Sequence, residues 1–584
     1  QPTSVPVSKG FAMPTVSAHV ALTLAQHIDA VFGVMGNGNA YFLDALERET
    51  DATFTAVRHE QGAVVAADAH FRASGRIAAA TSTYGAGFTN TLTALAEAVQ
   101  ARVPLVLVVG DEPTSGPRPW DVDQIALASA VGARTYTTGR EDAAATTVIA
   151  IEHALTYRLP VVLAIPYDVA AVEAGPVPVA PAPRLPAPLA PRGEFAEGML
   201  DEIAAALRDA ERPFLLAGRG AWLAGAGAAL GELATLTGAL TSSSALGRGV
   251  FPEQHYDLGV TGGFGADGAM ELIRQADVAV VFGAALNQFT MRFGELFAPG
   301  TRVFQVDVAP AATHAHVGGF VRGDARVVAE ELVARLRSEA GSVGAGDVVG
   351  AAAEGVADGP AEVAATPWRE SVDVAAARTY AEGDELAPDG RLDPRSAARR
   401  IAELLPEDRV VVSDGGHFIG WANMYWPVAS PDRMMMVGTA FQSIGQGWPS
   451  VVGAALARRE STVVLTSGDG GGLMAIADLE SAVRAAGGHG MAVIWNDAAY
   501  GAEVNLYGLK GLAEGPMRIP EVDFAAFGAA VGAEGVVVRT LADLERLATW
   551  AAEDAASRPF LLLDLRISGD VIAPYQEEII RVNS

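Results

Sequence analysis

The chain has 584 residues, half of them hydrophobic, and a formal net charge of −28. Its length predicts about two to four domains with sizeable cores, and the charge argues against nucleic acid as a partner because nothing offsets phosphate repulsion. The absence of cysteine excludes disulfides, zinc–thiolate sites and cysteine nucleophiles.

Neither a membrane span nor a secretory signal is evident in the sequence. No apolar run reaches the roughly 18 residues that a membrane-spanning helix requires. The N-terminal stretch QPTSVPVSKG lacks a basic region followed by an apolar one. We therefore expect a cytoplasmic protein with no membrane partner.

Short β-rich runs alternate with longer helical patterns along the whole chain. In chain order, these runs are VPLVLVVGDEP, RPFLLAGRG, ADVAVVFGAAL, TRVFQVDVAP, DRVVVSDGG, STVVLTSGDG and MAVIWND. A turn or polar residue directly follows each run, which is typical of parallel sheets with helices on both faces. We expect an α/β protein with three doubly wound parallel-sheet domains, and ligands beyond the carboxyl ends of the strands.

Two connectors divide the chain. Residues 174–193, AGPVPVAPAPRLPAPLAPRG, contain seven of the 32 prolines and cannot form a helix or a central strand. Residues 338–366 are rich in Gly and Ala and could carry a loose helix, but they are typical of a connector. The predicted domains are 1–175, 194–337 and 386–584, and the predicted linkers are 176–193 and 338–385.

The stretch TSGDGGGLMAIADLE, residues 466–480, follows a predicted buried strand and places Asp469 among four glycines. Bare glycines let backbone N–H groups approach an anion, and the following helix N-terminus adds a favourable dipole. A carboxylate there would repel a naked phosphate, so a bridging cation such as Mg²⁺ is indicated. The alternative is that Asp469 only caps the helix.

A second polar strand end favours the cation site. MAVIWNDAAYG contains Asn496 and Asp497, and Asp497 lies 28 positions after Asp469. A strand–helix–strand crossover of this length brings the two strand ends side by side. Together the two stretches indicate a metal–diphosphate site rather than a helix cap.

These two stretches resemble the GDG-to-asparagine signature of thiamine diphosphate enzymes, in the acetolactate synthase, pyruvate oxidase and benzoylformate decarboxylase group. The resemblance implies that Asp469, Asp497 and the carbonyl of Ala499 hold Mg²⁺ on the cofactor's diphosphate. Asp497 stands where asparagine is usual and the spacing is one residue longer, so Asn496 is the less favoured second ligand. The extra carboxylate is expected to tighten magnesium binding but to repel the diphosphate.

Two N-terminal stretches extend the resemblance. Residues 56–75, AVRHEQGAVVAADAHFRASG, resemble the family's RHEQGA stretch, which implies that Glu60 exchanges a proton with the cofactor's pyrimidine ring. Taken alone, Glu60 would be interpreted as a surface helix residue, because its neighbours His59 and Gln61 are polar as well. Residues 83–113, which begin TYGAGFTN, are similar to TSGPGATN…GLADA…VPLV and mostly predict a scaffold in which a glycine turn opens a helix.

Two C-terminal stretches resemble segments that contact the cofactor. Residues 410–423 contain His417 where glutamine is commoner, although a lone histidine is more often structural. Residues 439–456, TAFQSIGQGWPSVVGAAL, resemble GGLGTMGFGLPAAIGA, which places Ile444 as the wedge under the bent cofactor; otherwise it is a core residue. The implied cofactor-binding residues are Gly36, Gly85, Asn90, Gly416, His417, Ser443, Ile444, Gly468, Gly470, Gly471, Tyr500 and Gly501.

The middle segment contains few residues that indicate a bound ligand. In flavin-bearing relatives it holds FAD, and in others ADP or nothing. Residues 281–296 keep only the opening glycine of the usual GARFDDR stretch, and a strand-end acid such as Asp307 is a weak nucleotide signal. FAD is therefore possible but not indicated.

Some residues of the substrate pocket can be predicted from the sequence. Thr81 and Ser82 lie where aldehyde-releasing decarboxylases of the family place histidines for proton relay, which favours carboligation. Asn505 and Tyr507 could help to shape an acceptor site. The residues predicted to contact substrate are Asn37, Thr83, Tyr84, Gln124 and Glu503.

The resemblance implies an enzyme that decarboxylates a 2-oxo acid and ligates the acyl anion equivalent to an acceptor carbonyl, as acetolactate synthase does. It implies thiamine diphosphate and Mg²⁺, and a homodimer or homotetramer in which Glu60 and Asp469 come from different subunits. One alternative is a decarboxylase or C–C lyase for an acyl-CoA or a cyclic diketone. Another is a non-catalytic relative, against which the intact Glu60 argues. A nicotinamide dehydrogenase is set aside, because no full GxGxxG follows a strand.

Overall fold

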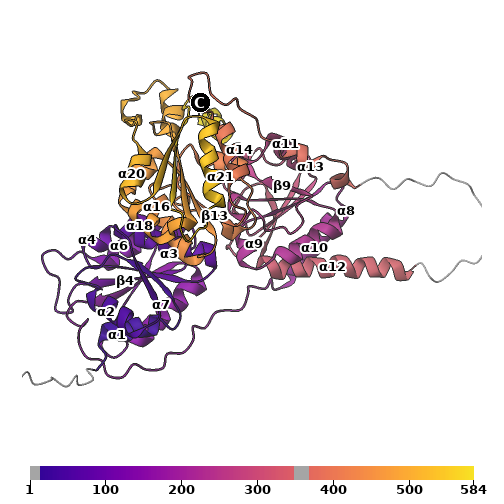
Figure 1. Cartoon of the computed structure of the whole chain (residues 1–584). Coiled ribbons are helices and arrows are strands. Elements are labelled where there is room, and N and C mark those ends of the chain that lie inside the picture. The colour runs from indigo at the N-terminus through magenta and orange to yellow at the C-terminus, as the bar shows by residue number, and fades with distance from the viewer. Residues whose placement is uncertain (1–12, 347–366, 584) are drawn as a thin grey trace, which may run out of the picture.

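Buried β-rich runs form three parallel sheets of six strands each, with helices on both faces. The structure, a computed structural model, describes residues 13–346 and 367–583. Figure 1 shows the N-terminal sheet in indigo and purple, the central sheet in magenta and the C-terminal sheet in orange and yellow. The predicted α/β class with three doubly wound parallel sheets is confirmed.

The N-terminal sheet has the strand order β2-β1-β3-β4-β6-β5. Strand β4, which VPLVLVVGDEP predicts, is buried along its whole length, as expected for a central strand covered on both faces. The strands are β1 (Ala30–Gly33), β2 (Thr53–Ala56), β3 (Ala78–Ser82), β4 (Leu105–Asp111), β5 (Arg134–Thr137) and β6 (Pro160–Pro166). The helices are α1 (Val16–Leu24), α2 (Ala40–Glu49), α3 (Glu60–Ser74), α4 (Ala86–Thr89), α5 (Leu92–Gln100), α6 (Gln124–Ala130) and α7 (Ala143–Tyr157).

The central sheet has the order β12-β11-β10-β7-β8-β9, so the direction of winding reverses between β10 and β7. Its strands are β7 (Pro213–Ala217), β8 (Leu240–Ser243), β9 (Asp257–Val260), β10 (Val278–Phe282), β11 (Arg302–Asp307) and β12 (Val317–Arg322). Its helices are α8 (Glu194–Asp209), α9 (Arg219–Leu223), α10 (Gly227–Thr237), η1 (Ala245–Gly247), η2 (Gly262–Phe264), α11 (Asp267–Arg274), η3 (Arg292–Gly294) and α12 (Ala325–Gly346).

The C-terminal sheet, ordered β14-β13-β15-β16-β18-β17, repeats the topology of the N-terminal sheet. Its strands are β13 (Arg409–Ser413), β14 (Met434–Met436), β15 (Thr462–Gly468), β16 (Gly490–Asn496), β17 (Glu534–Val538) and β18 (Leu561–Arg566). The first helices are η4 (Trp368–Glu370), α13 (Val374–Ala377), α14 (Pro394–Leu404), α15 (Ile419–Tyr425), η5 (Pro431–Arg433), α16 (Gly447–Ala457), α17 (Asp469–Met474), η6 (Ile476–Asp478) and α18 (Leu479–Ala486). The remaining helices are η7 (Gly487–His489), α19 (Gly501–Glu503), η8 (Val504–Gly508), η9 (Gly515–Met517), α20 (Phe524–Ala530), η10 (Leu541–Leu544), α21 (Glu545–Ala552) and α22 (Pro574–Asn583).

Both expected connectors can be followed in part. Residues 176–192 contain no helix or strand and run between the N-terminal and central bodies (Figure 1). Helix α12 continues to Gly346, past the predicted end of the central domain at residue 337. Residues 347–366 of the second predicted linker lie outside the described residues. Over the described ranges, no helix combines the length and apolar character that crossing a bilayer requires.

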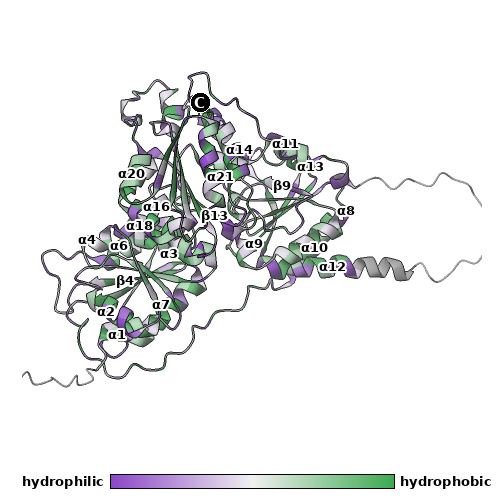
Figure 2. Cartoon of the chain, viewed as in Figure 1, coloured by the Kyte–Doolittle hydropathy of each residue, from purple (hydrophilic) through white to green (hydrophobic). Residues whose placement is uncertain are grey.

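Helices α3 and α16 join the N-terminal and C-terminal domains. One hydrophobic core runs through both sheets and includes residues of both helices, and Figure 2 shows hydrophobic residues concentrated on the strands and on the inward helix faces. A Cβ at Gly453 in α16 would collide with the carbonyl oxygen of Ala66 in α3. The two helices therefore pack with their backbones in close contact, which glycine alone permits.

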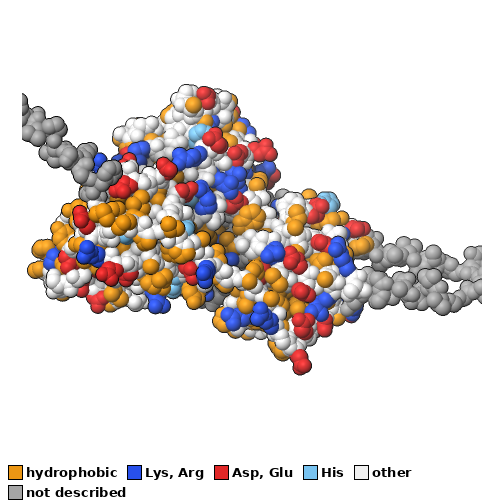
Figure 3. All heavy atoms as spheres, turned by 90° about the horizontal axis from the view of Figure 1, so that it is seen from below, with side chains coloured by type: hydrophobic (Ala, Val, Ile, Leu, Met, Phe, Trp, Pro, Cys, Tyr) orange, Lys and Arg blue, Asp and Glu red, His pale blue; other side chains and the backbone are white. Residues whose placement is uncertain are grey.

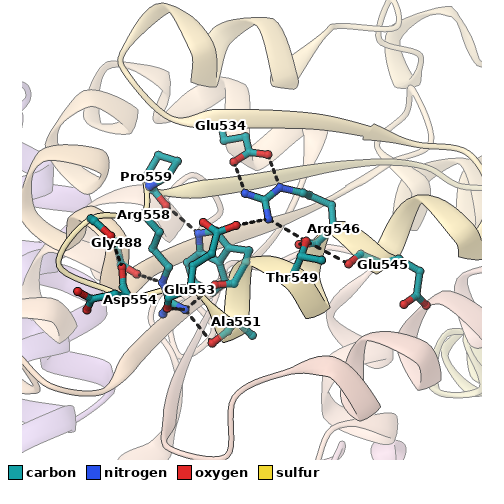
Figure 4. Close-up of polar contacts among 12 residues, drawn as sticks. Gly488, Glu534, Glu545, Arg546, Thr549, Ala551, Glu553, Asp554, Arg558 and Pro559 are labelled. Carbon is teal, nitrogen blue, oxygen red and sulfur yellow. Dashed lines mark hydrogen bonds and ion pairs between the residues drawn. The ribbon is translucent and has the colours of Figure 1, made fainter.

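Two arginines brace the sheet near the strand that carries the second polar strand end. Arg558 Nε donates to Gly488 O at 2.6 Å, in the turn that leads into β16 (Figure 4). The Arg558 guanidinium also lies 3.6 Å from the centroid of the Trp550 ring of α21. Arg546 donates from Nε and Nη2 to the two carboxylate oxygens of Glu534, at 2.5 and 2.7 Å, and so ties α21 to β17.

Candidate functional site

Two buried carboxylates meet at the carboxyl edge of the C-terminal sheet. Strands β15 and β16 are neighbours, with Gly468 in register with Trp495, so Asp469 and Asp497 follow directly beyond the paired ends. Asp469 Oδ1 accepts from Gly470 N at 2.9 Å, and Asp497 Oδ1 accepts from Ala499 N at 3.2 Å. The crossover that the sequence predicts thus brings the two strand ends together.

The electrostatics of this pair suit a divalent cation. Burial and the neighbouring charge of Asp497 raise the pKa of Asp469 above its ordinary value, and burial raises the pKa of Asp497. In residues 13–346 and 367–583 no group of three or more acids, histidines or cysteines is placed to hold a metal. A cation here would therefore have two side-chain ligands and would complete its shell with carbonyls, water or phosphate, as Mg²⁺ does.

Asn496 does not face this pair. Its Nδ2 donates to Asp564 Oδ1 and to Val522 O, each at 2.9 Å, and the side chain is buried. Of the two residues, it is therefore Asp497 that lies beside Asp469, and Asp497 is the second ligand that the sequence analysis favours.

The glycines of this stretch are packed against side chains. A Cβ at Gly470 would lie 2.6 Å from Tyr500 Cε1, and a Cβ at Gly468 would lie 2.9 Å from Phe418 Cδ1. Gly501 lies between Asp497 and His417, because a Cβ there would be 2.9 Å from Asp497 Oδ2 and 3.3 Å from His417 Nδ1. We expected these glycines to let an anion approach the backbone; their lack of a side chain also makes room for the Tyr500 and Phe418 rings.

Asp414 organises the loop that carries Ile444, and the sequence analysis did not single it out. Its carboxylate is fully buried and accepts from the backbone N–H groups of Gly415 at 2.8 Å, Gly445 at 3.0 Å and Gln446 at 3.3 Å. Burial raises the pKa of Asp414. A Cβ at Gly471 would lie 2.6 Å from Asp414 Oδ2, so Asp414 joins the loop that carries Ile444 to the glycine-rich stretch after β15.

The wedge position itself is half-buried. Ile444 lies against Gly415, where a Cβ would be 3.0 Å from Ile444 Cγ2. Ser443 precedes it, and its N–H donates to Gly438 O at 2.9 Å. Ile444 is therefore not enclosed in the core, and part of its side chain can contact a ligand.

His417 is held as a neutral imidazole. Its Nε2 accepts from Ala573 N at 3.0 Å, so the ring proton must lie on Nδ1, which faces Gly501. Burial lowers the pKa of His417 to about 4. Tyr575 of α22 closes this turn, because its hydroxyl lies 3.0 Å from Gly416 O and 2.8 Å from His417 O. Sequence reasoning missed Tyr575, which no motif marks.

Glu60 lies at the edge of the N-terminal sheet. It opens α3, where His59 caps the helix by accepting from Gln61 N at 3.2 Å. Asn90 Nδ2 donates to Glu60 Oε2 at 3.0 Å, and a Cβ at Gly87 would lie 3.3 Å from Glu60 Oε1. The structure thus brings Glu60 together with Asn90, two residues that the motifs predict separately.

A network of short polar side chains supports this edge. Asn39, which sequence reasoning missed, is buried and accepts from Gly36 N at 2.8 Å while donating to Thr81 Oγ1 at 3.0 Å. Thr83 Oγ1 accepts from Gly38 N at 2.8 Å. Thr81 and its neighbour in β3, Ser82, are fully buried, so the residues at the strand end are Thr83 and Tyr84 instead.

Gln124 braces the turn that carries Gly85. Its Oε1 accepts from Gly85 N at 2.7 Å and its Nε2 donates to Gly110 O at 3.0 Å, with the side chain buried. Gly85 has a φ of +60°, which explains the glycine. The amide of Gln124 is engaged at both ends, and its contact with substrate stays a prediction.

Tyr84 and Asn37 form the outer part of this edge. Asn37 Nδ2 donates to Tyr84 Oη at 3.1 Å. Arg118 stacks on Tyr84, with its guanidinium carbon 4.1 Å from the ring centroid, and is held by Asp121 at 2.8 Å. Arg118 was not predicted, and only its place between two prolines in a polar loop could have suggested it.

Two of the remaining predicted residues differ in exposure. Glu503 of α19 is exposed, whereas Asn505 is buried with its Nδ2 unpartnered among the described residues. In the central domain, Asp307 accepts from Ala309 N at 2.9 Å, so its carboxylate stabilises the turn after β11.

The chain matches three family models of thiamine pyrophosphate (thiamine diphosphate, TPP) enzymes. The N-terminal TPP binding domain matches at residues 14–127, the central domain at 200–332 and the C-terminal TPP binding domain at 414–563. The sulfoacetaldehyde acetyltransferase of Roseovarius nubinhibens is 27% identical over 99% of this chain and 96% of its own. The acetolactate synthase of Mycobacterium leprae is 26% identical over 87% of this chain and 80% of its own.

A solved thiamine diphosphate-dependent 4-hydroxybenzoylformate decarboxylase from Rhodococcus jostii RHA1 superposes with a TM-score of 0.72. It is 20% identical and covers 95% of this chain and 99% of its own, a likeness that supports the fold alone. The three matched regions cover most of the chain and carry the family's two cofactor-binding domains. The chain is therefore an enzyme of the thiamine pyrophosphate family, as its motifs predict.

Proposed function

We propose that this enzyme uses thiamine diphosphate and Mg²⁺ to decarboxylate a 2-oxo acid and to join the remaining acyl unit to an acceptor carbonyl. The observation that carries the carboligation is the composition of the N-terminal edge. Residues 34–40 after β1 and 83–90 after β3 contain no histidine, and Thr83 and Tyr84 follow β3. These two loops thus offer no imidazole to help release the acyl unit as an aldehyde, and the histidine beside Glu60, His59, uses its Nδ1 to cap α3.

The C-terminal edge would hold the cofactor's diphosphate. Asp469, Asp497 and the carbonyl of Ala499 are the proposed magnesium ligands, and the paired buried carboxylates fit a hard cation. We further propose that the Nδ1–H of His417 and the backbone N–H groups of Gly470 and Gly471 face the diphosphate, and that Gly416, Ser443, Gly468, Tyr500 and Gly501 line the same contact.

Glu60 would hold the proton that the reaction moves. The cofactor, when bound, supplies a carbanion-forming thiazolium ring that its own pyrimidine activates. Glu60 would exchange a proton with that pyrimidine, and the Asn90 amide keeps Oε2 oriented at 3.0 Å. Ile444 would support the bent shape of the cofactor, and Gly36 and Gly85 would leave room for it. Asn37, Thr83, Tyr84, Gln124 and Glu503 remain the proposed substrate contacts.

We also propose a homodimer, or a homotetramer built from it, in which the N-terminal edge of one subunit faces the C-terminal edge of another. Seen from below, hydrophobic side chains form broad patches on the part of the molecule where the N-terminal domain lies (Figure 3). Large apolar side chains are exposed next to both edges, as expected for an interface. They are Met35, Tyr41 and Trp120 on the N-terminal side and Phe441, Met474 and Tyr507 on the C-terminal side.

The proposed domain boundaries follow the sequence analysis: 1–175 for pyrimidine binding, 194–337 for the central domain and 386–584 for diphosphate binding. FAD is not part of the proposal. A second candidate is the conversion of a sulfonated aldehyde, with loss of sulfite, to an acyl unit that passes to a nucleophile such as phosphate, which the 27% identity to a sulfoacetaldehyde acetyltransferase over 99% of the chain favours.

The first experiment measures carbon dioxide release and product identity from a panel of 2-oxo acids, with sulfoacetaldehyde included. Wild type with thiamine diphosphate and Mg²⁺ is expected to form acyloin-type products, and Glu60→Gln to lose at least about 100-fold in rate. Aldehyde products instead would favour the decarboxylase or lyase alternative. Turnover of sulfoacetaldehyde alone would favour the second candidate. Cofactor binding without any turnover would weaken the carboligase proposal and favour a lyase that acts on a substrate outside the panel.

A further inference from the structure

A groove of about 570 Å³ lies between the N-terminal and C-terminal domains. It is bordered by strand β2, the second half of α16 and the end of α18, which lies beside the N-terminal domain in Figure 1. None of the residues assigned above to the cofactor, the magnesium ion or the substrate lines it. The groove is therefore a feature that the proposed reaction does not explain.

The lining of the groove is basic in a strongly acidic protein. Arg458, Arg459, Arg484 and His489 line it together with apolar and neutral residues, and no acidic residue does. The whole chain has 69 Asp and Glu against 41 Lys and Arg. Acids outside the groove already pair with Arg458 and Arg484, and Arg459 is left as the unpaired guanidinium that could bind a phosphate.

The three arginines differ in what already binds them. Arg458 donates from Nε to Ala73 O and pairs with Asp432. Arg484 donates from Nε to Glu480 at 2.8 Å and from Nη2 to Ala56 O at 2.6 Å. Arg459 is exposed and makes no hydrogen bond or ion pair to any described residue. Arg459 thus has all its donors available, and its neighbours are fixed beside it.

The groove also has an apolar side and a free backbone edge. Val452 and Leu456 of α16 supply the apolar side. The strand side is the backbone of β2, because the Phe54 ring packs against the core on the other face of the sheet, beside Val31. Strand β2 is the outer strand of its sheet, and the N–H groups of Thr53 and Val57 turn toward β1, where they donate to Asp29 O and Gly33 O. Because alternate residues of a parallel edge strand face outward, the N–H and C=O of Phe54 face the groove.

We propose that this groove binds a nucleotide. The phosphates would lie on Arg459, flanked by Arg458 and Arg484, and the planar base would lie against Val452 and Leu456 with its edge on the free N–H and C=O of Phe54. This inference goes beyond the proposed function, since it uses no residue of the catalytic site. Helix α16 starts directly after the Ile444 loop, so an occupied groove would contact the helix that supports the wedge.

Calorimetric titration of the full chain, saturated with thiamine diphosphate and Mg²⁺, tests the proposal with ADP as the probe. We expect one ADP per chain, with adenosine and inorganic phosphate each binding far more weakly. Arg459→Gln should weaken ADP binding by about 10-fold or more, which is the usual effect of removing a charge-assisted contact. Arg484→Gln should act in the same direction, and Arg539→Gln, an exposed arginine of the same domain, should leave the affinity unchanged.

Three results would overturn the proposal. The first is an absence of ADP binding to the chain saturated with thiamine diphosphate and Mg²⁺; if ADP then binds only when thiamine diphosphate is left out, ADP occupies the cofactor site instead. The second is inorganic phosphate binding as tightly as ADP, which would mean that no base is recognised. The third is an affinity for ADP that neither Arg459→Gln nor Arg484→Gln changes, with both variants folded as judged by circular dichroism.

Discussion

Replacing Asp414 by alanine should release the wedge loop. The carboxylate accepts from Gly415, Gly445 and Gln446, and all three N–H groups would lose their partner. An unsatisfied buried donor costs about 1–3 kcal/mol. Part of that total is offset because the variant no longer buries a carboxylate whose pKa burial has raised, so we expect a net loss of about 3–5 kcal/mol, similar to breaking other buried charged contacts.

The assay has two readouts. For a domain of about 150–250 residues each kcal/mol corresponds to about 2–4 °C, so the melting temperature of the C-terminal domain should fall by about 6–20 °C. The Kd for thiamine diphosphate should rise as well, because the loop that loses its anchor carries Ile444. Asp554→Asn is the matched control: it keeps the oxygen that accepts from Ala556 N on the surface of the same domain, and should change neither value.

A melting temperature within about 2 °C of wild type, together with an unchanged Kd for the cofactor, would refute the reasoning. Asp414→Asn separates charge from hydrogen bonding, because the amide keeps one acceptor oxygen. It should fall between wild type and alanine if the backbone contacts carry the effect. An asparagine variant as damaging as alanine would mean that the negative charge itself is required.

Three further changes test other parts of the site. Asp497→Ala should raise the Kd for Mg²⁺ by at least about 10-fold, since it removes one of two carboxylates, and retention of magnesium by Asp469 alone would contradict the ligand assignment. Gly470→Ala should weaken cofactor binding while leaving the circular dichroism spectrum unchanged, because the new Cβ would lie 2.6 Å from Tyr500 Cε1. His70 has a pKa that burial lowers to about 4, below its ordinary 6.5, so acid favours the unfolded chain. Between pH 6.5 and 4 this group should cost up to about 3 kcal/mol of stability, and in urea titrations His70→Gln should remove that contribution and leave the one from His417.

The sheets and the meeting of their polar ends could be predicted because both depend on local pattern. The run STVVLTSG is fully buried as β15, and the crossover length placed Asp469 beside Asp497. The strand order could not be predicted, because alternation of strands and helices is the same whatever the order. Short strand β14, Met434–Met436, has no apolar run long enough to mark it.

Residues that support the site from a distance were missed for a related reason. Asp414 contacts Gly445, 31 positions away, and Tyr575 reaches Gly416 from 159 positions away. Nothing in either local sequence carries a signal of those contacts. The glycines of 468–472 were predicted to expose backbone N–H groups to an anion. A side chain is also excluded at Gly468 and Gly470 because the rings of Phe418 and Tyr500 lie there, and only the folded chain brings those rings to this place.

The choice between Asn496 and Asp497 depends on a single register. Successive side chains of a strand face opposite sides, so only one of the two can reach Asp469. Asn496 donates to Asp564 at 2.9 Å on the neighbouring strand. A slip of one residue would exchange them: a neutral amide would then lie beside Asp469, and the Asp497 carboxylate would be buried against the Asp564 carboxylate. Two buried carboxylates repel each other unless a cation lies between them. The hydrogen bond from Arg558 to Gly488, in the turn before β16, supports the register that keeps Asp497 beside Asp469, where one cation could neutralise both.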